Sequence, residues 1–121
     1  MTIYYLAVWG GGKALSDREA AKYYASLLDG EMLPEFDAGV YAFNCALTRR
    51  YPDLEMLGDE EADASPWAAT PDISGGHMIV ALQAGRYAEV FPLILELAHE
   101  HGLVCFDPQT TKVHLPAHLP D

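Results

Sequence analysis

Three short apolar runs limit what this chain can fold into. They are rich in aromatic and β-branched residues, each is ended by glycine or a turn, and they cover Ile3–Trp9, His77–Gln83 and Leu103–Phe106. Such runs predict strands, and Lys112–Leu115 follows the third run across an Asp-Pro turn as its expected partner strand. No run approaches the roughly 20 apolar residues of a membrane span, so we expect a small sheet in a globular core.

Segments of helical periodicity lie between these strands. A capping box of Ser16 and Glu19 predicts a helix that Gly30 ends. Apolar residues three and four positions apart predict a second helix from Phe36 to Arg50 and a third over Tyr87–His101. The element order is therefore β-α-α-loop-β-α-β-β. The simplest architecture for it is an α+β two-layer sandwich, a small, mainly antiparallel sheet with its helices on one face.

A long segment without sustained periodicity divides the two patterned halves. The 121 residues suffice for a single domain, with this segment at 53–75 and a short tail at 116–121. Residues 53–75 hold two prolines and two glycines, so we expect an acidic loop with at most one short helical turn. Loops of this length inside a compact domain are either functional or disordered.

Negative charge is concentrated in the middle of the chain. The formal net charge is −11, and residues 23–85 hold eleven acids against Arg49 and Arg50. Six of these acids fall within residues 53–63, where no Lys or Arg occurs. A field of this sign repels nucleic acid and anionic membrane, and it speeds encounter with a cationic partner at low salt. We therefore expect a protein partner with a basic surface, and neither nucleic acid nor membrane.

The acidic loop and the tryptophan that follows it form the candidate binding site. Carboxylates would steer a basic partner, while a large aromatic side chain supplies the apolar area that anchors an interface. The alternative is that the tryptophan caps the core and the acids are merely solvated. The candidate partner-binding residues are Asp53, Glu55, Asp59, Glu60, Glu61, Asp63 and Trp67.

Other candidate motifs lack the residues or the spacing that their chemistry requires. Gly10-Gly11-Gly12-Lys13 lies between a strand and a helix, but it lacks the first glycine and the hydroxyl residue of a P-loop. His99 and His101 diverge by about 200° on a helix, so they cannot easily share a metal ion. His77 is expected at the surface. We predict no metal site, no cofactor and no catalytic residue, while a Ser/His/Asp or Cys/His nucleophile stays open.

Both cysteines lie in apolar stretches without a metal-type spacing. We expect Cys45 and Cys105 to be buried free thiols. The start of the chain shows no basic leader before its short apolar run, so no signal peptide is expected. Together these features favour a reducing, cytoplasmic compartment.

The C-terminal third, from Arg86 to Leu115, resembles a family of short bacterial proteins. The likeness rests on a helix ending Glu-Leu-Ala-His-Glu-His at residues 96–101, followed by Gly-Leu-Val-Cys-Phe-Asp-Pro-Gln at 102–109. It extends to Ser-Pro-Trp at 65–67 and to the opening strand that ends at Trp9. The family is that of immunity proteins of toxin systems: contact-dependent inhibition, type VI secretion and related polymorphic toxins. The resemblance implies no catalytic residues.

This resemblance and the charge lead to one functional hypothesis. The chain would bind and neutralise a cognate bacterial toxin domain, a basic and nuclease-like one, by covering its active site or substrate groove. An alternative is a small-ligand-binding protein or small enzyme with a pocket between sheet and helices, at Tyr4, Tyr5, Tyr23 or Tyr24. A third is a homodimer that pairs along Lys112–Leu115.

Overall fold

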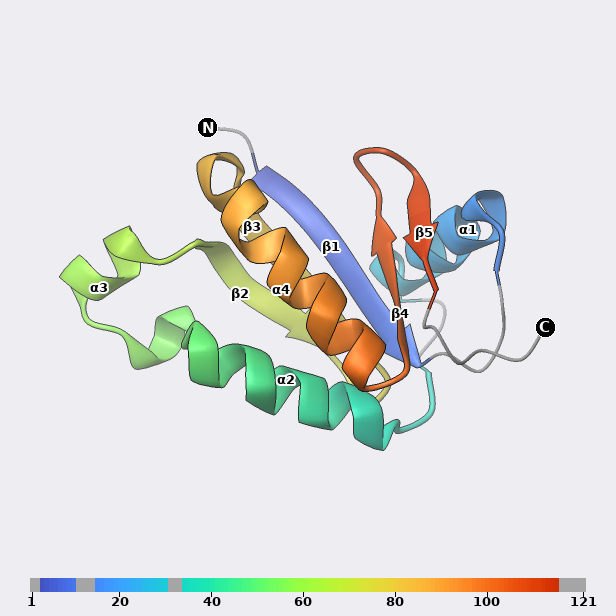
Figure 1. The fold of residues 1–121 in the computed structure, drawn as a ribbon, viewed down its shortest axis with the longest axis horizontal. Coiled ribbons are helices and arrows are strands. Elements are labelled where there is room, and N and C mark those ends of the chain that lie inside the picture. Colours follow the sequence, from blue (N-terminus) through green and yellow to red (C-terminus); the bar gives the residue numbers. More distant parts are fainter. Residues whose placement is uncertain (1–2, 11–14, 31–33, 116–121) are drawn as a thin grey trace.

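A computed structural model describes residues 3–10, 15–30 and 34–115. Within these ranges the strands form one five-stranded antiparallel sheet in the order β2-β3-β1-β4-β5, which confirms the α+β class and the small antiparallel sheet (Figure 1). In chain order the elements are β1 (Ile3–Gly10), α1 (Asp17–Leu28), α2 (Ala38–Arg50), the 3₁₀ turn η1 (Leu54–Met56), α3 (Asp59–Ala64), β2 (Trp67–Ile73), β3 (His77–Gln83), the 3₁₀ turn η2 (Ala84–Arg86), α4 (Tyr87–Glu100), β4 (Leu103–Asp107) and β5 (Lys112–His114).

β1 is the central strand of the sheet. It pairs with β3 on one side and with β4 on the other, so that Trp9 lies opposite both His77 and Val104. Its middle is buried on both faces, because Leu6 and Val8 join one apolar cluster while Ala7 and Trp9 join another. Alternation of side chains along a strand produces this division.

The helices cover both faces of the sheet, which corrects the prediction of a single helical face. α2 and α4 lie side by side over one face, where Phe43 and Ile94 pack on the sheet (Figure 1). α1 covers the opposite face near β4 and β5, where Ala20 and Leu27 pack against Trp9. The physical reason is that a strand whose residues are all apolar needs cover on both sides.

Local sequence signals set the helix ends. Ser16 and Glu19 form the predicted capping box, with hydrogen bonds of 3.1 and 3.0 Å, and Gly30 adopts a φ of +70° after α1. α2 begins later than its apolar spacing suggested, because the Asp37 carboxylate accepts hydrogen bonds from the first amides of the helix. Phe36 therefore precedes α2 and is 71 % exposed.

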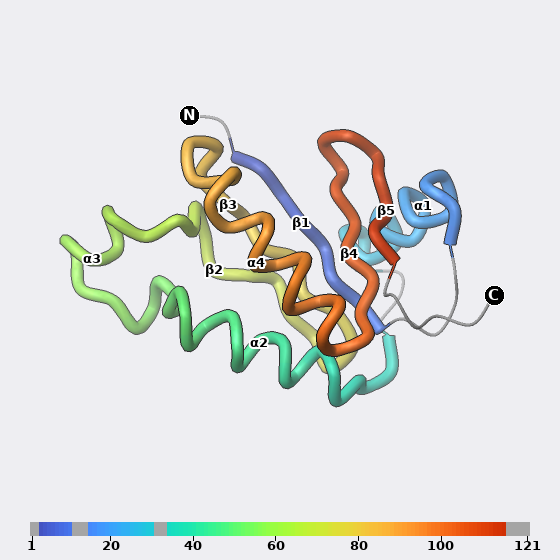
Figure 2. The backbone as a smooth tube through the Cα atoms, viewed as in Figure 1, coloured from blue at the N-terminus to red at the C-terminus, as the bar shows by residue number. Residues whose placement is uncertain are grey.

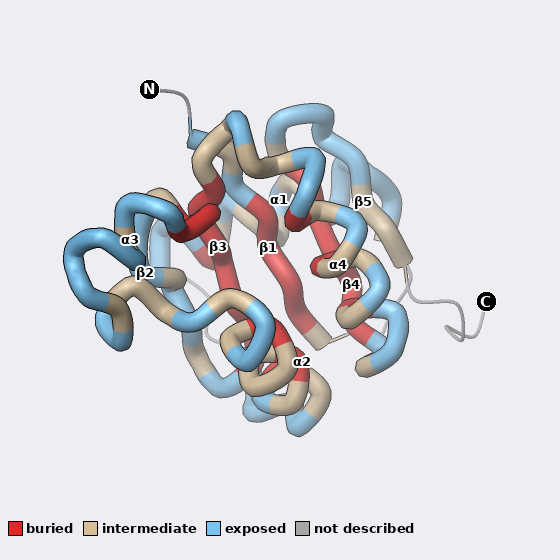
Figure 3. Tube along the Cα trace, turned by 60° about the vertical axis from the view of Figure 1, so that its left-hand side comes forward, coloured by how far each residue is buried: buried red, intermediate tan, exposed pale blue. Residues whose placement is uncertain are grey.

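The segment predicted as a loop, residues 53–75, holds regular structure. It contains η1, α3 and the edge strand β2, so the expectation of one short helical turn is too low. The sequence pattern did not predict β2. Its register against β3 shifts twice, and it contains Pro71, a residue type that is unfavourable within strands. Figure 3 shows the contrast between the buried β3 and the exposed α3. Of the predicted features, residues 11–13 of the glycine-rich motif and the tail at 116–121 lie outside the described residues.

Candidate functional site

α3 projects from one end of the molecule. It has no buried residue, and Figure 2 shows it at the far end from α1. The segment from Asp53 to Ala64, here called the acidic arm, carries all six acidic candidates. In the described part of the chain, no carboxylate of this arm forms an ion pair with Lys or Arg. The four acids that α3 exposes are Asp59, Glu60, Glu61 and Asp63.

The two remaining acids of the arm differ from these four. Asp53 is half-buried and caps η1, since its Oδ1 accepts a hydrogen bond from the Glu55 amide at 3.3 Å. Glu55 is exposed. Met56, which the charge pattern did not single out, is 78 % exposed on the same turn. The arm thus offers apolar as well as acidic surface.

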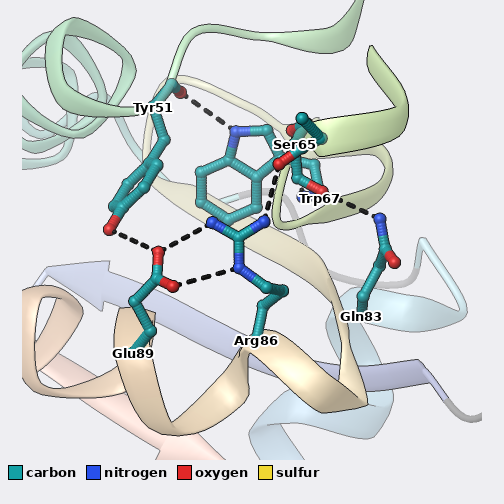
Figure 4. Close-up of polar contacts among 7 residues, drawn as sticks. Tyr51, Ser65, Trp67, Gln83, Arg86 and Glu89 are labelled. Carbon is teal, nitrogen blue, oxygen red and sulfur yellow. Dashed lines mark hydrogen bonds and ion pairs between the residues drawn. The ribbon is translucent and has the colours of Figure 1, made fainter. Parts of the chain in front are cut away.

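Arg86 connects the arm to the start of α4 (Figure 4). Its Nη1 donates a hydrogen bond of 2.6 Å to the carbonyl oxygen of Ala64, the last residue of α3. Its Nε and Nη2 donate to the two oxygens of Glu89 at 3.1 and 2.8 Å, and Tyr51 Oη donates to Glu89 at 3.0 Å. The hydrogen bonds from Arg86 and Tyr51 hold the pKa of Glu89 below its usual value.

Trp67 follows the acidic arm in the chain and is buried in the core. Its side chain is 5 % exposed, and its Nε1 donates to the Tyr51 carbonyl oxygen at 3.0 Å. Gln83 adds a second connection, since its Nε2 donates to the Ser65 carbonyl oxygen at 2.8 Å (Figure 4). Trp67 is therefore a core residue of the fold, and its contact with a partner stays a prediction. Burial of the large indole on the sheet favours its use as a core residue.

A groove lies on each side of the acidic arm. The first, here called the Arg86 groove, has a volume of about 170 Å³, and its lining includes Tyr51, Leu57, Glu61, Pro66 and Arg86. The second, the Gln83 groove, has a volume of about 350 Å³ and is lined by Ile3, Leu54, Ala62, Asp63, Trp67, Ala68 and Gln83. Both are open surface features beside the exposed carboxylates.

A serine, a histidine and an aspartate meet at the turn between β2 and β3. His77 is 3 % exposed, which corrects its expected place at the surface. Ser74 Oγ lies 2.6 Å from His77 Nδ1, and it also accepts hydrogen bonds from the amides of Gly76 and His77. His77 Nε2 has no hydrogen-bond partner and lies 3.8 Å from Asp72 Oδ2. Because the Ser74 oxygen accepts hydrogen bonds from two amides of its own turn and contacts His77, this arrangement stabilises the hairpin between β2 and β3.

Neither a metal cluster nor a membrane span is found within the described residues. No group of three or more His, Cys, Asp or Glu side chains there is placed to hold an ion. None of the helices in the described ranges is long and apolar enough to cross a bilayer. Cys45 is half-buried and Cys105 is buried, both as free thiols.

Comparison with known proteins gave no match. No family model matches the chain, and neither the curated proteins nor the solved structures yielded a match. What the chain does therefore has to be inferred from its charge and geometry.

Five of the seven predicted residues are exposed acids of the acidic arm, whereas Asp53 is half-buried and Trp67 is buried. Sequence reasoning missed Tyr51, Gln83, Arg86 and Glu89, which fix the arm in place. The spacing of Arg86 and Glu89, three apart at the start of a helix, indicates a local ion pair. Nothing local indicates that Arg86 also reaches Ala64, because that contact joins distant parts of the chain.

Proposed function

We propose that this protein is an immunity protein that binds and neutralises a cognate bacterial toxin domain. The toxin domain would be basic and nuclease-like, and the acidic arm would cover its active site or substrate groove. Cytoplasmic residence fits this role and belongs to the same proposal. The observation that carries the proposal is the exposed acidic face of α3, which has no ion pair with the described residues, on a projection that Arg86 and Trp67 fix to the body.

Electrostatics explains why such an arm suits a nuclease-like target. Enzymes that cleave nucleic acid hold phosphates with Lys and Arg, so their substrate grooves carry positive potential. Carboxylates on one helix can bind to that positively charged groove in place of phosphates. A fixed arm loses little conformational entropy on binding, which favours affinity as well as rapid encounter.

Neutralising the arm tests this proposal. The triple substitution Asp59→Asn/Glu60→Gln/Glu61→Gln is expected to slow association with a basic nuclease domain about tenfold at low salt, and to flatten the salt dependence of the rate. Stopped-flow fluorescence across a salt series measures both. The matched control is Asp29→Asn/Glu96→Gln/Glu100→Gln, which removes the same charge from exposed positions outside the arm. Equal slowing by both triple variants would show that net charge, and not the arm, directs association.

The alternative of a small-ligand site gains no specific support from the geometry. Tyr4 packs edge-on against Tyr87 at 4.9 Å, and Tyr23 packs against Trp9 at 4.7 Å, so these rings fill space within the fold. A hollow of about 400 Å³ that includes Tyr23 runs along the outside of α1 and not between sheet and helices. A co-purifying small molecule would favour the alternative.

A further inference from the structure

The two grooves beside the acidic arm differ in the charges on their walls. The Arg86 groove contains a guanidinium group whose donors already bind Ala64 and Glu89, and it also contains Glu61. In the Gln83 groove, Asp63 is the one charged side chain among the described lining residues. A cationic side chain from a partner therefore meets repulsion from Arg86 in the first groove and only attraction in the second.

The Gln83 groove combines hydrogen-bond acceptors with apolar walls. Asp63 is exposed, and its carboxylate makes no ion pair with the described residues. Gln83 uses its Nε2 on Ser65, and Figure 4 shows its amide oxygen on the side away from that bond. Ile3, which is 38 % exposed, and Leu54 supply apolar wall. A long side chain with an aliphatic stem and a cationic, donor-rich end matches this combination.

We propose that the Gln83 groove receives an arginine side chain from the basic partner, with its guanidinium group between Asp63 and Gln83. Arginine fits better than lysine, because its planar group donates in several directions at once and can satisfy a carboxylate and an amide oxygen together. Its stem would lie along Ile3 and Leu54. This inference rests on the proposed function and specifies which of the acids contacts the partner directly.

A comparison of two substitutions of equal charge separates this contact from general attraction. Asp63→Asn and Glu61→Gln each remove one negative charge from α3, but Asp63 lines the Gln83 groove and Glu61 lines the Arg86 groove. The probe is a synthetic peptide of alternating glycine and arginine, titrated calorimetrically against each full-length variant. We expect Asp63→Asn to weaken binding about fivefold and Glu61→Gln less than twofold, since only the first removes a direct acceptor.

A structural readout accompanies the affinities. In nitrogen-15 NMR spectra, the side-chain amide of Gln83 and the indole Nε1–H of Trp67 should shift in a saturable manner on addition of the peptide. The neutral substitution Ala68→Phe, which fills the groove without changing charge, should weaken binding about as much as Asp63→Asn. Thermal unfolding confirms that each variant is folded before it is titrated.

The outcomes distinguish this inference from the proposed function. Unequal losses with shifts at Gln83 support the groove as the arginine site. Equal losses for the two substitutions, with shifts spread over the acids of α3, overturn the groove and leave the charge-based proposal standing. Absence of salt-dependent binding to the peptide and to a basic nuclease domain overturns both.

Discussion

Asp107 shows how hydrogen-bond donors satisfy a buried carboxyl group in this protein. It is 3 % exposed, and no cation in the described residues pairs with it. Its oxygens instead accept hydrogen bonds from Tyr87 Oη at 2.8 Å and from the backbone and side chain of Gln109 at 2.9 and 2.6 Å. Burial, together with the bond to Asp107, raises the pKa of Tyr87 well above its usual value. Buried carboxylates without such donors are costly, so this network stabilises the fold.

Removing one donor from this network should have a measurable cost. Tyr87→Phe keeps the ring that packs on Tyr4 but removes a hydrogen bond to Asp107. We expect the free energy of unfolding to fall by about 1 to 3 kcal/mol, measured by urea denaturation. Tyr41→Phe is the control, because Tyr41 is 64 % exposed and should change stability by less than about 0.5 kcal/mol. Equal effects of the two substitutions would contradict the assigned role of the bond.

The buried thiol of Cys105 predicts a loss of stability at alkaline pH. Burial, with a smaller contribution from Asp107, raises its pKa from 9.0 to about 12. The folded state holds the thiol proton more tightly than the unfolded state does. The contribution of this thiol to the free energy of unfolding is therefore complete below pH 9 and is lost as pH rises toward 12. We expect urea midpoints to fall between about pH 8 and about pH 10 in the wild type and to fall less in Cys105→Ala.

The control for this experiment is Cys45→Ala, since Cys45 is only half-buried. It should retain the alkaline loss of the wild type. A Cys105→Ala variant that loses as much stability as the wild type over this range would show that other groups cause the effect. The pKa values of Tyr23, Tyr24, Tyr51 and Tyr87 are also raised, and their contributions follow above pH 10.

At the scale of elements, α2 lies very close to the end of α4. A Cβ atom added to Gly39 would lie 2.7 Å from the His101 carbonyl oxygen. Gly→Ala in a helix normally stabilises by up to about 1 kcal/mol. Here we expect Gly39→Ala to lower the unfolding temperature instead, as measured by calorimetry. Gly85→Ala, where nothing lies within 4 Å of the added atom, should be neutral or stabilising. A stabilised Gly39→Ala variant would show that the two helices can separate without cost.

The elements also show what could be predicted from the sequence. β1, β3 and β4 are continuous apolar runs, and the capping box sets the start of α1, so local patterns sufficed for these. β2 was missed because it is an irregular edge strand whose main inward residue is Trp67. The local sequence does not indicate which face of the sheet α1 covers, since this depends on how the chain crosses the sheet.

The candidate site, like the fold, could be predicted only in part from the sequence. Exposure of the acids followed from their number and from the absence of basic neighbours, whereas the grooves depend on Gln83 at the end of β3 and on Arg86 in η2. Contacts between such distant segments depend on tertiary packing, which a linear pattern does not encode.

At the scale of the whole molecule, the acidic arm is held by few contacts. Arg86→Met removes the bond to Ala64 while keeping most of the aliphatic stem. We expect hydrogen exchange of the amides in α3 to rise about tenfold, with exchange in β1 unchanged, because the arm can then open locally. Arg18→Met, at an exposed position on α1, is the control and should leave both regions unchanged. Unchanged exchange in α3 would show that Trp67 suffices to hold the arm.

The central place of β1 has a consequence for synthesis. This strand leaves the ribosome before either of its neighbours, and it stays unpaired on both edges until β3 and then β4 have been made. Its exposed run of apolar and aromatic residues is meanwhile a site at which nascent chains could associate. We expect the sheet to form only after translation has passed β4, because β1 lacks a partner on one edge until then.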